Sequence, residues 1–98
     1  MPLTSTRVIL PGLLRDLVGG MAEIEVADDT AGQTVGQVLD RAFTTHRILE
    51  GKVRDERGLI RRHVKVFVNG EDATRGAGAA TPVPAGARIH IINAVSGG

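Results

Sequence analysis

The stretch TVGQVLDRAF, residues 34–43, decides the fold that this sequence predicts. It opens with the pattern of a capping box, in which Thr34 is followed three residues later by Gln37. Gly36 in the first turn weakens the helix by up to about 1 kcal/mol relative to alanine. The apolar side chains recur at helical spacing and form one stripe, made of Val35, Val38, Leu39, Ala42 and Phe43. We therefore expect one amphipathic helix whose apolar stripe needs a sheet to cover it.

Strand-like stretches flank this helix on both sides. Residues 6–10 (TRVIL) and 22–26 (AEIEV) precede it, and the glycine pair at 19–20 marks a turn between them. Residues 63–68 (HVKVFV) and 88–93 (RIHIIN) follow it and read as strands. This order predicts an α+β fold of the β-grasp type, a mixed sheet of four to five strands wrapped around one main helix. The first and last strands are expected to lie side by side and parallel.

Two segments between these elements carry weaker signals. Residues 50–62 (EGKVRDERGLIRR) are charged and interrupted by glycine, which favours a mobile loop. Residues 75–87 (RGAGAATPVPAGA) hold at most a short edge strand, because their prolines cannot donate to a sheet ladder. The 98 residues are therefore expected to form one β-grasp domain over residues 1–94, followed by a flexible diglycine tail over residues 95–98.

Composition disfavours several classes of function. The net charge is only +1 and the chain has no Tyr or Trp, so nucleic acid is not an expected partner. The absence of cysteine removes disulfides, thiolate metal sites and cysteine nucleophiles. The opening stretch MPLTSTRVILPGLL lacks the apolar run of a signal peptide or a membrane span. We therefore expect a cytoplasmic protein without a membrane partner.

Neither a metal site nor a cofactor site is predicted. His46, His63 and His90 are far apart and lack the spacing of metal ligands. The acidic pairs Asp28-Asp29 and Asp55-Glu56 lie in loop-like, charged surroundings with no apolar pocket to shift their acidity, and they are interpreted as solvated. The glycines of GAGAA neither follow a strong strand nor open a helix, so a phosphate-binding loop is disfavoured.

The C-terminal stretch HIINAVSGG, residues 90–98, carries a strand-like pattern almost to the end of the sequence. If residues 88–93 form a central strand, the chain leaves the sheet at Ala94. The tail is then expected to be thin, because terminal glycines have no side chains to dock. The residues predicted to project into a narrow tunnel of another protein are Val95, Ser96, Gly97 and Gly98.

Four stretches that together cover most of the chain resemble a known family. They are LPGLLRDLVGG near the start, TVGQVLDRAF, HVKVFVNGED at residues 63–72, and the ending INAVSGG. The family is that of the MoaD/ThiS-type ubiquitin-like sulfur carriers, which includes the small subunit of molybdopterin synthase and the thiazole-synthesis carrier. Among its branches, the chain is most similar to the carriers for cysteine synthesis in actinobacteria. Ser96 stands where alanine is common, and Asn93 stands where proline is often seen.

The resemblance implies a mechanism centred on Gly98. An E1-like adenylating and sulfurylating enzyme would activate the Gly98 carboxylate with ATP, and a sulfide donor would then displace AMP and leave a thiocarboxylate. The adenylate is needed because a carboxylate is a poor electrophile until one oxygen becomes a good leaving group. The chain would thus be a protein co-substrate and not an enzyme. Its second partner would be a sulfur-acceptor enzyme, either cysteine-synthase-like or another biosynthetic enzyme.

One face of the predicted sheet is expected to dock these partners. Alternation along the strands places Ile9, Phe67, His90 and Ile92 on the face away from the helix. A sheet face that only meets solvent would more often carry polar side chains there. An exposed apolar cluster of this kind is typical of a partner surface.

Three alternatives stay open at the level of the sequence. The chain could be the small subunit of a molybdopterin synthase, where the carrier is also a stable subunit. It could be a ubiquitin-like modifier that joins its terminal glycine to lysines of other proteins. It could also be a non-reactive interaction module that uses only its sheet face.

Overall fold

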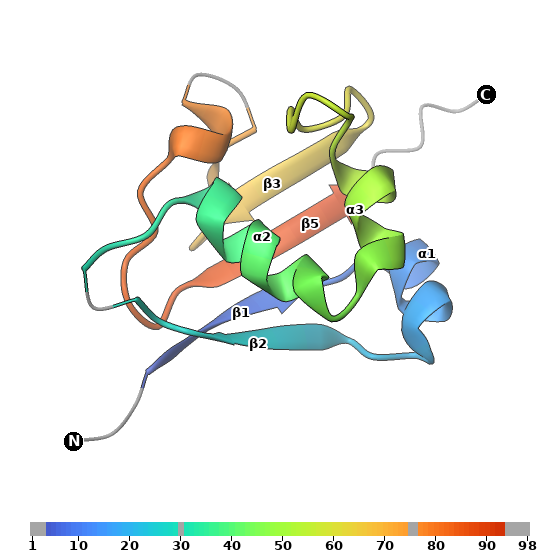
Figure 1. Cartoon of the computed structure of the whole chain (residues 1–98), viewed down its shortest axis with the longest axis horizontal. Coiled ribbons are helices and arrows are strands. Elements are labelled where there is room, and N and C mark those ends of the chain that lie inside the picture. The colour runs from blue at the N-terminus through green and yellow to red at the C-terminus, as the bar shows by residue number, and fades with distance from the viewer. Residues whose placement is uncertain (1–3, 30, 75–76, 94–98) are drawn as a thin grey trace.

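The computed structural model describes residues 4–29, 31–74 and 77–93. These residues form helices, short 3-10 helices (η) and strands that are labelled in chain order (Figure 1). The elements are β1 (Ser5–Ile9), α1 (Gly12–Arg15), η1 (Asp16–Val18), β2 (Glu23–Ala27), α2 (Val35–Thr44), α3 (Arg47–Val53), β3 (Val64–Val68), β4 (Glu71–Asp72), η2 (Gly78–Ala80) and β5 (Arg88–Asn93).

The strands form one five-stranded sheet in the order β2-β1-β5-β3-β4, and the predicted β-grasp fold is confirmed. The first two strands pair antiparallel as a hairpin, with Val8 opposite Ile24. The first and last strands, β1 and β5, pair in parallel, with Val8 opposite Ile89. Strand β3 pairs antiparallel with the other edge of β5, so the strand that leads to the C-terminus lies in the centre of the sheet.

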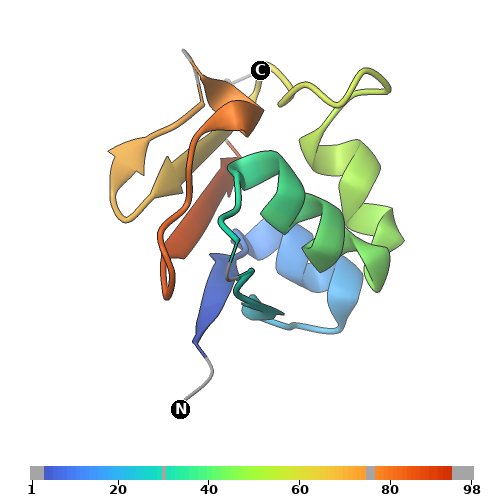
Figure 2. The same cartoon turned by 60° about the vertical axis from the view of Figure 1, so that its left-hand side comes forward.

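Helix α2 is the amphipathic helix that the sequence predicts. Its capping box is formed, because the N–H of Gln37 donates to the Thr34 hydroxyl (3.3 Å) and the N–H of Thr34 donates to the Gln37 side chain (2.9 Å). The helix lies across one face of the sheet, as the side view shows (Figure 2). The core between them contains the whole apolar stripe of α2 and, from the strands, Val8, Ile24, Val26, Val64, Val66, Ile89 and Ile91.

The predicted mobile loop over residues 50–62 is wrong. Its first residues belong to α3, in which Leu49 and Val53 lie four positions apart and are fully buried. The chain then folds back on itself in a small hairpin, where Arg54 and Ile60 form a β-bridge and the N–H of Asp55 donates to the Leu59 carbonyl (2.9 Å). The burial of two apolar side chains outweighs the charged composition of the segment.

Two further segments differ from the sequence prediction. The connection between β1 and β2 contains α1 and η1, because Leu14 turns into the core and a helical turn brings it there. The edge strand is β4, which lies before residues 75–87. In the described part of that range the chain forms η2 and one isolated bridge, between Thr34 and Pro82. The prolines explain this, since they cannot complete a ladder.

Candidate functional site

Strand β5 carries the chain toward the predicted reactive terminus. It is held on one side by β1, where the N–H of Arg7 donates to the Ala87 carbonyl (3.0 Å), and on the other side by β3. Its last residue, Asn93, lies opposite Val64. The predicted tail lies outside the described residues; it consists of Val95, Ser96, Gly97 and Gly98. The described part of the site is therefore the central strand from which the tail continues and the surfaces around it.

The start of β5 is fixed by a turn residue of β3. Asn69 has a left-handed backbone (φ 50°), which asparagine tolerates better than most residues, and Gly70 follows it with φ 88°. In this geometry the Asn69 side-chain oxygen accepts a hydrogen bond from the Arg88 N–H, and the Asn69 N–H donates to the Arg88 carbonyl, both at 2.9 Å. The turn thus sets the register of β5 at its first residue.

Asp28 fixes the same end of β5 from the other side, which corrects the interpretation of this carboxylate as solvated. Its Oδ1 accepts hydrogen bonds from the Thr6 hydroxyl (2.6 Å) and the Gln33 amide (2.9 Å), and its Oδ2 accepts one from the Gly86 N–H (2.8 Å). Hydrogen bonds from the hydroxyls of Thr4 and Thr6, with those from Gln33 and Gly86, hold the pKa of Asp28 well below its usual range. Asp28 therefore joins β1, the start of α2 and the start of β5.

The four residues predicted to dock partners lie on the sheet face opposite helix α2. Ile9 is paired with His90 in the parallel ladder, and His90 is paired with Phe67 in the antiparallel one, so these three side chains form a row across β1, β5 and β3. All three are half-buried, and Ile92 is 45% exposed. We call Ile9, Phe67, His90 and Ile92 the open-face patch. The sequence pattern placed them correctly, and their docking role stays a prediction.

Charged side chains frame the open-face patch. On the β2 side, Arg7 forms an ion pair with Glu23 (3.4 Å), and Ser5 donates a hydrogen bond to Glu25 (2.8 Å). On the β3 side, Lys65 lies opposite Ile92 and is exposed. On the β4 side, the exposed Asp72 lies opposite Phe67. The patch therefore has carboxylates along β2 and next to Phe67, and a cation next to Ile92.

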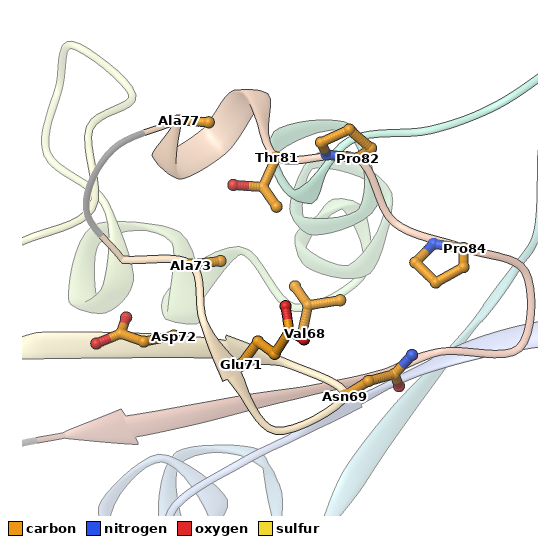
Figure 3. Close-up of a pocket in the computed structure, with 9 residues that line it drawn as sticks. All are labelled: Val68, Asn69, Glu71, Asp72, Ala73, Ala77, Thr81, Pro82 and Pro84. Atoms are coloured by element: carbon orange, nitrogen blue, oxygen red, sulfur yellow. The ribbon is translucent and has the colours of Figure 1, made fainter.

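A groove of about 460 Å³ lies between the β3–β4 turn and the segment that follows η2 (Figure 3). Its lining includes Asn69, which holds Arg88, and Val68, which pairs with Ile89 near the start of β5. The groove is therefore at the end of β5 opposite to Asn93. The side chains drawn in Figure 3 are Val68, Asn69, Glu71, Asp72, Ala73, Ala77, Thr81, Pro82 and Pro84.

Asp55 is a second carboxylate with a structural role. Asp55, interpreted from the sequence as solvated, organises its own hairpin: hydrogen bonds from the N–H groups of Leu59 and Arg57 lower its pKa. The described residues show neither a metal-binding cluster nor a membrane-spanning helix. Within residues 4–29, 31–74 and 77–93, no three His, Asp or Glu side chains are grouped as metal ligands. In the same ranges, no helix is long and apolar enough to cross a membrane.

Comparison with known proteins identifies the family. The model of the ThiS family matches residues 8–98. This chain belongs to the ThiS family. The sulfur carrier protein CysO of Mycobacterium tuberculosis is 28% identical to it over 92 residues, which are 93% of this chain and 96% of CysO. The predicted relationship to the ubiquitin-like sulfur carriers is thus confirmed.

Solved structures agree with this family in fold. SAMP1 from Haloferax volcanii superposes with a TM-score of 0.79 at 30% identity and covers 96% of this chain and 99% of its own. A chain in the BexX/CysO complex of Amycolatopsis orientalis superposes with a TM-score of 0.77 at 28% identity, covering 95% of this chain and 99% of its own. The chain is therefore similar over nearly its whole length to ubiquitin-like proteins of the β-grasp fold.

Proposed function

We propose that this protein is a sulfur carrier whose Gly98 carboxylate is adenylated and then converted to a thiocarboxylate that donates sulfur in the synthesis of cysteine or a related metabolite. The observation that carries the proposal is the match to the ThiS family, which extends through the diglycine end of the sequence. The similarity to CysO, a sulfur carrier protein, supports cysteine as the product. The protein acts in the cytoplasm as a co-substrate and binds neither cofactor nor metal of its own.

The chemistry needs only the terminal carboxylate from this chain. ATP is attacked by the Gly98 carboxylate, pyrophosphate leaves, and an acyl-adenylate forms on the E1-like enzyme. The sulfide donor then attacks the carbonyl carbon, the C–O bond to AMP breaks, and AMP leaves with the electron pair. The absence of cysteine from the chain is consistent with a carrier that holds its sulfur on the terminal carbon.

The fold supports this role by fixing the strand that precedes the tail. Strand β5 is paired with β1 from Arg88 to His90 and with β3 from Ile89 to Asn93, and Asn69 and Asp28 hold its start. The chain is therefore part of the sheet as far as Asn93, and the two glycines of the tail offer no bulk to a narrow enzyme tunnel. We propose that the open-face patch docks first on the E1-like enzyme and later on the acceptor enzyme.

A modifier role is the second candidate, because SAMP1, a small archaeal modifier protein, is 30% identical to this chain. Conjugation to lysine needs the same adenylate, so the two functions differ only in the group that attacks it, which is sulfide in one case and a lysine amine in the other. Supplying the adenylated protein with sulfide and with a lysine-bearing target in competition separates them. A role as the small subunit of molybdopterin synthase predicts instead co-purification with a large subunit.

Deletion of Gly98 and the substitution Gly97→Val test the proposal. Each variant is incubated with the E1-like enzyme, ATP and sulfide, and the product is measured by intact mass. The unaltered chain should gain about 16 Da, the difference between sulfur and oxygen, while both variants stay unmodified and keep the same Tm. Thiocarboxylate formation in the variants would contradict the proposal.

A further inference from the structure

The positive charge of this protein is concentrated in one segment. Residues 52–65 contain six Lys and Arg against two Asp and Glu, whereas the rest of the chain has six basic residues against nine acidic ones. The small net charge of +1 therefore hides two regions of opposite sign. A local field of this kind acts on a partner within about one Debye length, roughly 8 Å at physiological salt.

Some cations of this segment are used by the fold. Arg54 is buried and forms hydrogen-bonded ion pairs with Asp40 (2.8 Å) and Glu50 (Nε to Oε2, 2.6 Å). Burial lowers the pKa of Arg54, but the hydrogen bonds to Glu50 and Asp40 outweigh it and leave the pKa raised. Arg57 pairs with Asp55 inside the hairpin. Both arginines are thus paired with carboxylates of the described chain, and the Arg57 side chain remains 73% exposed.

Other cations are not neutralised. Arg62 and Lys65 are exposed and form no ion pair with any described residue, and His63 between them is also exposed. Arg61 donates its Nε to the Gly51 carbonyl (2.7 Å), a contact with a neutral group that leaves its charge in place. Arg61, Arg62 and His63 line a hollow of about 420 Å³, and its other lining residues are Asp55, Arg57, Leu59 and Ile60. We call Arg61, Arg62, His63 and Lys65 the basic surface.

The basic surface lies beside the point where the described chain ends. Val64, between His63 and Lys65, is the partner of Asn93 in the ladder, and Lys65 is the partner of Ile92 in the open-face patch. Gly98 is five residues beyond Asn93, so an extended chain reaches at most about 18 Å. An enzyme that holds the terminal carboxylate therefore has its active site within about 18 Å of Asn93, at the end of the sheet that also carries Lys65.

We infer that the basic surface is a second contact area for the E1-like enzyme, and that the enzyme presents Asp and Glu side chains around the entrance through which the tail passes. This inference rests on the proposed function and specifies the chemistry of its partner. The apolar patch supplies contact area, and the adjoining cations steer the approach and set the orientation of the tail. Charges at the rim of an interface act mainly on the association rate, so the effect depends on salt.

Reversing the charge of Lys65 tests the inference, and reversing the charge of Arg88 on the same sheet face is the matched control. Lys65→Glu and Arg88→Glu change the net charge equally, but Arg88 is at the start of β5, about 13 Å of strand away from Ile92. The E1-like enzyme of the same organism is the probe, with KM for the carrier and direct binding without ATP as the readouts. Lys65→Glu should raise KM about tenfold at low salt with kcat unchanged, and Arg88→Glu should change it less than about twofold.

Salt dependence and charge rescue distinguish steering from structural damage. The difference between Lys65→Glu and the unaltered chain should vanish near 1 M salt, where the Debye length is about 3 Å, and Lys65→Arg should behave as the unaltered chain. An Asp→Lys or Glu→Lys change at the enzyme's tail entrance should restore binding of Lys65→Glu. Equal effects of Lys65→Glu and Arg88→Glu would overturn the inference while leaving thiocarboxylate formation intact. An unaltered chain that forms no thiocarboxylate would instead overturn the proposed function, and the inference with it.

Discussion

Removal of the Asp28 carboxylate should destabilise the domain more than any other single change at its polar surface. Thr6, Gln33 and Gly86 each donate a hydrogen bond to the carboxylate, and the side chains of Thr6 (0% exposed) and Gln33 (7% exposed) are nearly or fully buried. Leaving such donors unpaired costs about 1–3 kcal/mol each, so Asp28→Ala should lower the free energy of unfolding by about 3 kcal/mol. For a domain of this size, Tm should fall by roughly 12–20 °C.

The same carboxylate predicts how stability depends on pH. Its pKa is lowered in the folded state from the usual value of 3.8, so the unfolded chain binds the proton more readily. The contribution of Asp28 is therefore complete above about pH 5 and is lost as the pH falls through the folded pKa. Urea unfolding of the unaltered chain and of Asp28→Ala from pH 7 to pH 2 should give curves that stay apart down to about pH 4 and converge below it.

The adjacent exposed residue, Asp29, provides the matched control. Its side chain accepts one exposed hydrogen bond, from the N–H of Ala31 (2.9 Å), so Asp29→Ala should cost less than about 1 kcal/mol. Equal losses in the two variants, or a loss in Asp28→Ala that does not shrink in acid, would refute the account of Asp28 as the residue that joins β1 to β5.

Two further substitutions test the docking face and the buried arginine. Phe67→Asp should abolish binding to the E1-like enzyme and leave Tm nearly unchanged, because Phe67 is on the open face. As the control, Val66→Asp at the adjacent, fully buried position should unfold the domain. Unfolding of Phe67→Asp would show instead that the core needs this side chain. Arg54→Ala should lower the free energy of unfolding by about 1–2 kcal/mol. This is less than the usual loss of a buried ion pair, because Asp40 and Glu50 are 67% and 45% exposed and water can hydrate their carboxylates in the variant. Calorimetry showing no change in Tm would contradict this.

Much of the fold could be predicted because its signals are local. The capping box and the apolar stripe of α2 occupy ten consecutive residues, and the alternation of β3 and β5 states which side chains share a face. The open-face patch was predicted in the same way, since Ile9, Phe67 and His90 follow from the period of two along each strand.

The features that could not be predicted from the sequence depend on contacts between distant residues or on patterns of only a few residues. Asp28 is interpreted as solvated because its partners are at positions 6, 33 and 86, which only the folded sheet brings together. Helix α3 has seven residues and contains Gly51, yet two spacings of four residues could have indicated it: Leu49 with Val53, and Glu50 with Arg54. Charged composition alone is thus a poor guide when a few apolar side chains are buried.

The most direct test of the central claim is to locate the sulfur on the protein purified from its own cells. Mass alone is ambiguous, because oxidation of Met1 or Met21 also adds about 16 Da. The chain has no cysteine, so a thiol alkylating reagent followed by fragmentation should modify Gly98 and no other residue. The account predicts an alkylated thiocarboxylate on the C-terminal fragment that ends in Gly98. A plain carboxylate on Gly98, both in cells and after incubation with the E1-like enzyme, ATP and sulfide, would contradict it.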